Sequence, residues 1–100
     1  MRTIKNLLTK KGRVYVYLPD EEIARQFLVD AEREGFTFGD GASVTKREPS
    51  DIYALNEDKT INFVGFAGHI LFNSAKKIGK SKLFKVNYRK YREGIKEYLM

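Results

Sequence analysis

Cysteine is absent from this sequence of 100 residues, which excludes disulfide bonds, thiolate catalysis and zinc or iron–sulfur sites that depend on cysteine. Histidine occurs once, at His69, so no second histidine can share a metal ion with it. No apolar run approaches the roughly 20 residues of a membrane-spanning helix, and the N-terminal segment lacks the apolar core of a secretory signal. We therefore expect a cytoplasmic protein with no metal, no cofactor and no membrane association.

Recognisable catalytic motifs are missing as well. The tripeptide GKS at 79–81 resembles the end of a phosphate-binding loop, but Ser74 stands where that motif needs its first glycine. The tripeptide GDG at 39–41 lacks the alternating acids of a calcium-binding loop, and no serine lies in a nucleophile-elbow motif. We therefore predict that the protein is not an enzyme, although a site made only of carboxylates, such as Asp40 and Asp51, stays open.

Acidic residues are scarce in the second half of the chain. The first fifty residues contain nine Lys or Arg and eight Asp or Glu, whereas the last fifty contain ten and five. No acid occurs between Lys59 and Glu93, while residues 20–34 hold most of the acids of the first half. A basic surface attracts polyanions. The predicted anion- or partner-binding site consists of cations and tyrosines from the acid-free stretch: Lys76, Lys77, Lys80, Lys82, Lys85, Tyr88, Arg89, Lys90, Tyr91 and Arg92.

Aromatic residues are interleaved with these cations. Proteins that hold single-stranded nucleic acid stack aromatic rings on the bases while Lys and Arg follow the phosphates. The alternative is a place in the hydrophobic core, because Phe84 and Tyr88 would share one face of a strand with Val86. We predict the core for Phe84 and leave both alternatives open for Tyr88 and Tyr91.

One long helix is predicted over residues 20–34. Asp20 can accept hydrogen bonds from the free amides of the first turn, and apolar residues recur at helical spacing through the segment. Gly35 can end the helix in the left-handed conformation that glycine favours, with Phe36 folding back onto the last turn.

Alternation of apolar and polar residues predicts strands elsewhere, most clearly in RVYVYL at 13–18. The other predicted strands are residues 36–38, 52–55, 60–64 and 83–88. Residues 3–9 suit a short amphipathic helix, and the apolar spacing after Gly65 suits a second short helix at 66–78 that Gly79 would cap.

This order of elements predicts a single α+β domain over residues 1–100. We expect a small, mainly antiparallel sheet of about four or five strands, packed on one principal helix at 20–34. Residues 42–50 are expected to form a loop, and residues 91–100 a frayed helix or an irregular tail.

Three segments of the chain carry a family resemblance: DEEIARQFLVDAEREGFTFGDG, DIYALNEDKTINFVGFAGHILF and KLFKVNYRKYREG. Their shared features are a helix that ends in Gly-Phe, an Asp-Gly pair, a hairpin followed by glycine, and the late run VNYRKYREG at 86–94. In these features the chain resembles small proteins encoded in phages and prophages of Gram-positive bacteria of the gut Firmicutes type, over roughly residues 12–95. Related sequences often carry an acid in place of Asn87, so the basic pole is particular to this chain.

These observations favour a non-enzymatic binding module. The resemblance implies a phage or prophage accessory protein of the bacterial cytoplasm, one that acts on a host factor, for example as an inhibitor of host defence. The alternative is a nucleic-acid-binding protein that uses the Lys-, Arg- and Tyr-containing segment 76–92. The expected partner is thus a host protein or a nucleic acid, and the oligomeric state stays open, with a homodimer among the options.

Overall fold

The structure, a computed structural model, describes residues 2–74 and 76–100. The described helices are α1 (Ile4–Leu7), α2 (Glu21–Arg33), α3 (Phe66–Ser74) and α4 (Tyr88–Arg92), with a short 3-10 turn at Val44–Lys46. The described strands are β1 (Arg13–Tyr17), β2 (Thr37–Phe38), β3 (Ile52–Leu55), β4 (Thr60–Phe63), β5 (Lys77–Ile78) and β6 (Ser81–Asn87). None of the described helices is long and apolar enough to cross a membrane.

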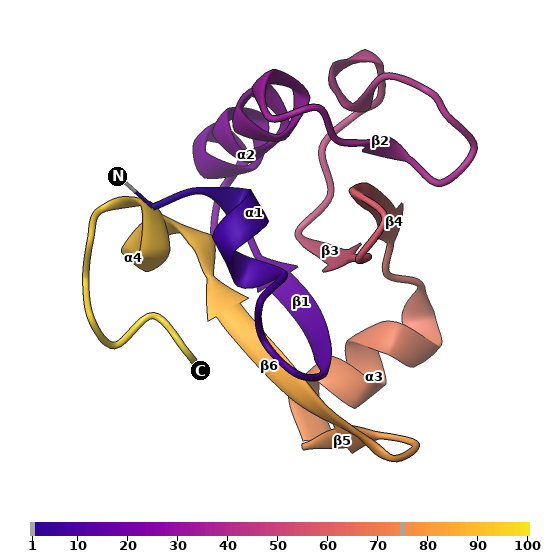
Figure 1. The fold of residues 1–100 in the computed structure, drawn as a ribbon, viewed down its shortest axis with the longest axis vertical. Coiled ribbons are helices and arrows are strands. Elements are labelled where there is room, and N and C mark those ends of the chain that lie inside the picture. The colour runs from indigo at the N-terminus through magenta and orange to yellow at the C-terminus, as the bar shows by residue number, and fades with distance from the viewer. Residues whose placement is uncertain (1, 75) are drawn as a thin grey trace.

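The six strands form one sheet in the order β2-β4-β3-β1-β6-β5, and the ribbon in Figure 1 shows β1 and β6 side by side. The α+β class is therefore confirmed, but the expectation of a mainly antiparallel sheet is wrong. Strands β1 and β6 run parallel, as do β2 and β4, while the other three pairs are antiparallel. The parallel pairs join segments distant in sequence, whose relative direction no turn signal reports.

Helix α2 has the ends that the sequence predicts. The Asp20 carboxylate accepts a hydrogen bond from the Ile23 amide at 2.9 Å and so caps the first turn. Gly35 follows the helix with a φ of +88°, where an L side chain would be strained. The Phe36 amide then donates to the Ala31 carbonyl at 2.9 Å, which closes the last turn.

Helices lie on both faces of the sheet. The expectation that one principal helix packs on the sheet is therefore wrong. Neighbouring residues of a strand point to opposite faces. Along β1, Val16 packs in the same cluster as Phe27 of α2, whereas Tyr15 packs in a second cluster with Phe72 of α3. Helices α2 and α3 therefore cover opposite faces.

The helix predicted at 66–78 is wrong in its second part. Helix α3 ends at Ser74, Ala75 lies outside the described residues, and Lys77 and Ile78 form strand β5. The reason is a hairpin, in which Lys77 pairs with Lys82 and Gly79 takes a φ of +60° at the turn. A glycine at the first position of a two-residue turn is typical of hairpins.

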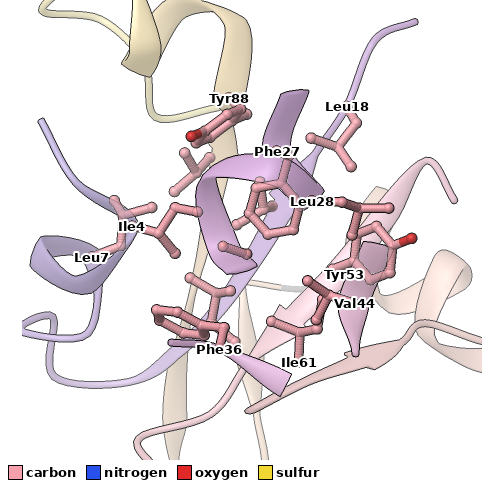
Figure 2. Close-up of a cluster of buried hydrophobic side chains, with 14 of the residues drawn as sticks. Ile4, Leu7, Leu18, Phe27, Leu28, Phe36, Val44, Tyr53, Ile61 and Tyr88 are labelled. Carbon is pink, nitrogen blue, oxygen red and sulfur yellow. The ribbon is translucent and has the colours of Figure 1, made fainter. Parts of the chain in front are cut away.

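The larger core lies between the sheet and helices α1, α2 and α4 (Figure 2). Phe27 stands at its centre, stacked on the Tyr53 ring at 5.5 Å and meeting the edge of the Tyr88 ring at 5.0 Å. A buried phenylalanine contributes about 3 to 5 kcal/mol relative to alanine. The core thus reaches from the middle of the sheet to the first residue of α4, which belongs to the predicted binding stretch.

Candidate functional site

Strand β6 separates the predicted binding residues into two groups. The hairpin lysines lie at the beginning of β6 and the cations of α4 follow its end, at opposite ends of the strand in Figure 1. A strand of seven residues is about 20 Å long at roughly 3.3 Å per residue. The structure therefore does not bring all ten residues into one patch.

The arginines of α4 are engaged in ion pairs. The Arg89 guanidinium pairs with Asp20, the residue that caps α2. The Arg92 Nε atom lies 2.9 Å from Asp30 Oδ2, and Asp30 is only 7% exposed. Both arginines consequently join α4 to α2, while Lys90 is exposed on the outer side of the same helix.

Tyr88 and Tyr91 are core residues, with exposed fractions of 3% and 4%, so neither ring is available to stack on a base. The Tyr88 hydroxyl donates to Asp30 Oδ2 at 2.5 Å, and the Tyr91 hydroxyl donates to the Thr3 carbonyl at 2.5 Å. Burial, together with the adjacent Asp30 carboxylate, raises the pKa of Tyr88 far above its ordinary value. The tyrosines in the predicted site are thus structural.

The two tyrosines share the buried side because the backbone changes from strand to helix at Asn87. The Asn87 side chain accepts a hydrogen bond from the Lys90 amide at 3.2 Å, so it caps a helix at the point where the sequence predicts that a strand continues. Residues three apart on a helix share a face. Tyr88 and Tyr91 therefore both turn inward, and the asparagine was the signal that could have revealed this.

The carboxylate of Asp30 accepts hydrogen bonds from four donors, two on its own helix α2 and two on α4. It accepts from the Gln26 amide at 2.9 Å and from Arg33 at one oxygen, and from Tyr88 and Arg92 at the other. Burial acts to raise the pKa of Asp30, but the hydrogen bonds from Tyr88, Arg92 and Gln26 outweigh it and hold that pKa below its usual range. Asp30 is thus a charged structural residue, and each of its two carboxylate oxygens accepts two hydrogen bonds.

The hairpin lysines are arranged differently. Lys77 and Lys82 are direct partners across the antiparallel β5–β6 pair, so two like charges stand opposite each other. Such a pair is destabilising by up to about 1 kcal/mol. No ion pair with a carboxylate of the described residues is formed by Lys77, Lys80 or Lys82.

A fourth lysine joins them from the other end of the sequence. The ammonium groups of Lys10 and Lys82 lie 5.3 and 5.0 Å from the centre of the Phe84 ring, which is half-buried. Cations prefer the electron-rich face of an aromatic ring. We use the name hairpin surface for Lys10, Lys77, Lys80, Lys82 and Phe84.

Gly12 makes this meeting of segments feasible. A β-carbon at Gly12 would lie 2.3 Å from the Lys82 carbonyl oxygen, so only glycine lets the α1–β1 loop approach β6 so closely. Sequence reasoning missed Lys10, although the run KKGR at 10–13 was a visible signal of a basic loop with a close backbone approach.

The remaining predicted lysines lie off the hairpin surface. Lys85 lies on the opposite face of β6, with its ammonium group 5.5 Å from the Phe72 ring. Lys76 precedes β5 and accepts a backbone hydrogen bond from Leu83 at 2.9 Å. The structure therefore places Lys82 opposite Lys77 and beside Lys10, with Lys80 in the turn that joins β5 to β6. The other predicted cations lie elsewhere.

A separate polar cluster surrounds His69. Its Nε2 atom lies 2.9 Å from Asp51 Oδ1, and its Nδ1 atom lies 2.9 Å from the Gly65 carbonyl. The contacts with Gly65 and Asp51 raise the pKa of His69. The Ser50 hydroxyl donates to the same carboxylate and not to the imidazole, so the cluster lacks the serine–histidine hydrogen bond that activates a nucleophile.

The two loop carboxylates considered above have separate partners. Asp40 pairs with Arg47 at 2.6 Å, while Asp51 contacts His69. Within residues 2–74 and 76–100, no group of three His, Cys, Asp or Glu side chains could hold a metal ion. Comparison with protein-family models, curated proteins and solved structures gives no match.

Proposed function

We propose that this protein is a non-enzymatic binding module that holds an acidic protein partner on its hairpin surface. The observation that carries the proposal is the facing pair Lys77 and Lys82, joined by Lys10 around Phe84. Facing lysines reduce the stability of the hairpin in isolation. A partner with carboxylates opposite this surface would relieve that repulsion, and the half-buried ring supplies apolar contact beside the charges.

A protein partner fits better than the alternative of single-stranded nucleic acid. Base stacking needs exposed aromatic faces, whereas Tyr88 and Tyr91 are buried and the Phe84 ring already has lysine ammonium groups beside it. The hairpin surface offers charge without a stacking platform. Binding to phosphates alone would be independent of base sequence and steeply dependent on salt.

The biological setting belongs to the same proposal. We place this module in the bacterial cytoplasm as a phage or prophage accessory protein that acts on a host factor, in the manner of a counter-defence inhibitor. The support is the resemblance described for residues 12–95, together with a surface suited to binding and not to catalysis. An acidic face on the host factor would be the complement of the hairpin surface.

The test measures binding of a fluorescently labelled polyglutamate peptide and of an oligothymidylate, each over a series of salt concentrations. Reversing the charge of Lys80 and Lys82 together should weaken polyglutamate binding by about tenfold or more, because each charged contact contributes roughly 1 kcal/mol or more. The matched control reverses Lys46 and Lys90, two exposed lysines outside the hairpin surface.

Equal losses in both double variants, or no loss in either, would reject the hairpin surface as the site. Tighter binding of oligothymidylate than of polyglutamate, lost in the hairpin variant alone, would replace the acidic protein partner with nucleic acid. Retention of far-ultraviolet circular dichroism by each variant separates loss of binding from loss of fold.

A further inference from the structure

A pocket of about 290 Å³ lies beside α4, away from the hairpin surface. It is enclosed by the segment before α1, by the last turn of α2 and by α4, which lie next to one another in Figure 1. Three arginines line it, Arg2, Arg33 and Arg92, one from each of these segments. Its size is at the lower end of the range of small-molecule sites, about 300 to 1,000 Å³.

Each of these arginines uses only some of its N–H donors in hydrogen bonds within the protein. Arg33 uses Nη2 and Arg92 uses Nε to hold Asp30, while Arg2 uses Nη1 to reach the Tyr91 and Ile95 carbonyls at 3.2 and 2.7 Å. A guanidinium group carries five N–H donors. Most of the other donors of these three groups have no acceptor among the described residues.

The carboxylates of the pocket have their acceptor oxygens occupied already. Asp30 accepts from four side chains, and the two Glu34 oxygens accept from the Ile4 and Lys5 amides, each at 2.9 Å. Three positive groups thus face the pocket against two negative ones whose oxygens are engaged. The free N–H donors that line the pocket therefore suit a ligand that supplies acceptor oxygens.

We infer that this pocket binds a phosphoryl group. A guanidinium fork matches two oxygens of a phosphate at once, and three forks from separate elements can surround a group with three terminal oxygens. The Asp30 carboxylate has a positioning role here, because it fixes Arg33 and Arg92 from the inner wall. The inference is independent of the proposed function, since the two surfaces share no residue.

The experiment titrates isotope-labelled protein with inorganic phosphate and, in a second arm, with phosphoserine, while backbone amide shifts are recorded by NMR. Wild-type protein should bind with a millimolar dissociation constant or tighter, with the largest shifts in residues 2–4, 30–34 and 88–92. Arg33→Gln should weaken binding by about tenfold or more, the effect of losing a charge-assisted hydrogen bond.

Arg25→Gln is the matched control, because Arg25 also lies on α2 and pairs with a carboxylate one turn away, but outside the pocket. If the Arg33→Gln protein does not fold, phosphate binding is measured with Arg2→Gln, which changes another arginine of the pocket. Binding that survives both pocket variants, binding lost equally in the control, or an absence of saturable shifts in wild-type protein would overturn the inference. Phosphoserine binding tighter than phosphate would assign the site to a phosphate monoester, and equal binding to the free ion.

Discussion

The two ends of strand β6 carry cations that serve different purposes. At its end, Arg89 and Arg92 of α4 pair with Asp20 and Asp30 and so connect two helices. At its beginning, Lys82 faces Lys77 of β5, and neither lysine has a carboxylate of the described residues within ion-pair distance. Cations of the first kind support the fold, whereas those of the second kind act against it and are available to a partner.

The cations that pair with carboxylates at the α4 end are arginines, whereas those at the hairpin end are lysines. The fork of an arginine can hold a carboxylate and still offer further donors, as Arg92 does at Asp30. The ammonium group of a lysine is a strongly hydrated point charge on a flexible stem, suited to an exposed surface that meets a partner. The difference predicts that charge changes at the two ends alter stability in opposite directions.

The largest effect is expected at the α4 end, from Asp30→Ala. This change leaves Arg92, Arg33 and the buried Tyr88 hydroxyl without their acceptor, so the free energy of unfolding should fall by about 2 to 4 kcal/mol. Urea denaturation measures it. The control, Asp40→Ala, removes an exposed carboxylate that also pairs with an arginine, and it should lower the free energy of unfolding much less. Similar losses in the two variants would contradict the structural role of Asp30.

A smaller loss of stability is expected from Gly12→Ala, in the loop that approaches the hairpin end of β6. The new β-carbon would clash with the Lys82 carbonyl and push the α1–β1 loop from β6, at a cost of about 1 to 3 kcal/mol. Gly65→Ala meets no neighbouring atom within 4 Å and serves as the control. Stability can be followed by thermal unfolding, and an unchanged midpoint for Gly12→Ala would show that the loop does not approach β6 as described.

The effect of pH on stability at the α4 end can be isolated by comparing wild type with Asp30→Ala. The pKa of Asp30 lies below its unfolded value, about 3.9, so its contribution is complete above that value and is lost as pH falls through the folded pKa. The difference in unfolding free energy between wild type and Asp30→Ala should therefore shrink between about pH 6 and about pH 2. Urea titrations at both pH values measure it, and a constant difference would argue against a charged Asp30.

The smallest expected change is an increase in the free energy of unfolding, opposite in sign to the changes above. Lys77→Glu puts an acid opposite Lys82, and this should raise the unfolding free energy by about 0.5 kcal/mol while it weakens polyglutamate binding. The corresponding reversal at the other end, Arg92→Glu, should destabilise, because it sets a second carboxylate beside Asp30. Equilibrium denaturation compares the two. A destabilised Lys77→Glu protein would mean that the facing lysines are not in conflict.

Local elements of this fold could be predicted from sequence, because their signals are local. The N-cap at Asp20 and the glycine after α2 delimit that helix, and alternation in RVYVYL identifies β1. The parallel pairing of β1 with β6 could not be predicted, since it joins residues about seventy positions apart with no connecting turn. The mixed sheet was missed for that reason.

The hairpin surface was only partly predictable for a similar reason. A count of cations along the chain shows an excess of charge but not the acid that each cation meets in space. Asp30 lies far from Arg92 in sequence and neutralises it, while Lys10 lies far from Lys82 and joins it at Phe84. A helix cap at Asn87, where a strand was expected to continue, puts Tyr91 on the same buried side as Tyr88.

The most direct test of the division between the two ends is to map polyglutamate binding on the labelled protein by NMR. The account predicts that the largest amide shifts fall in residues 10–13 and 77–84, while α4 changes little. Largest shifts at α4, or shifts spread evenly over the molecule, would contradict it.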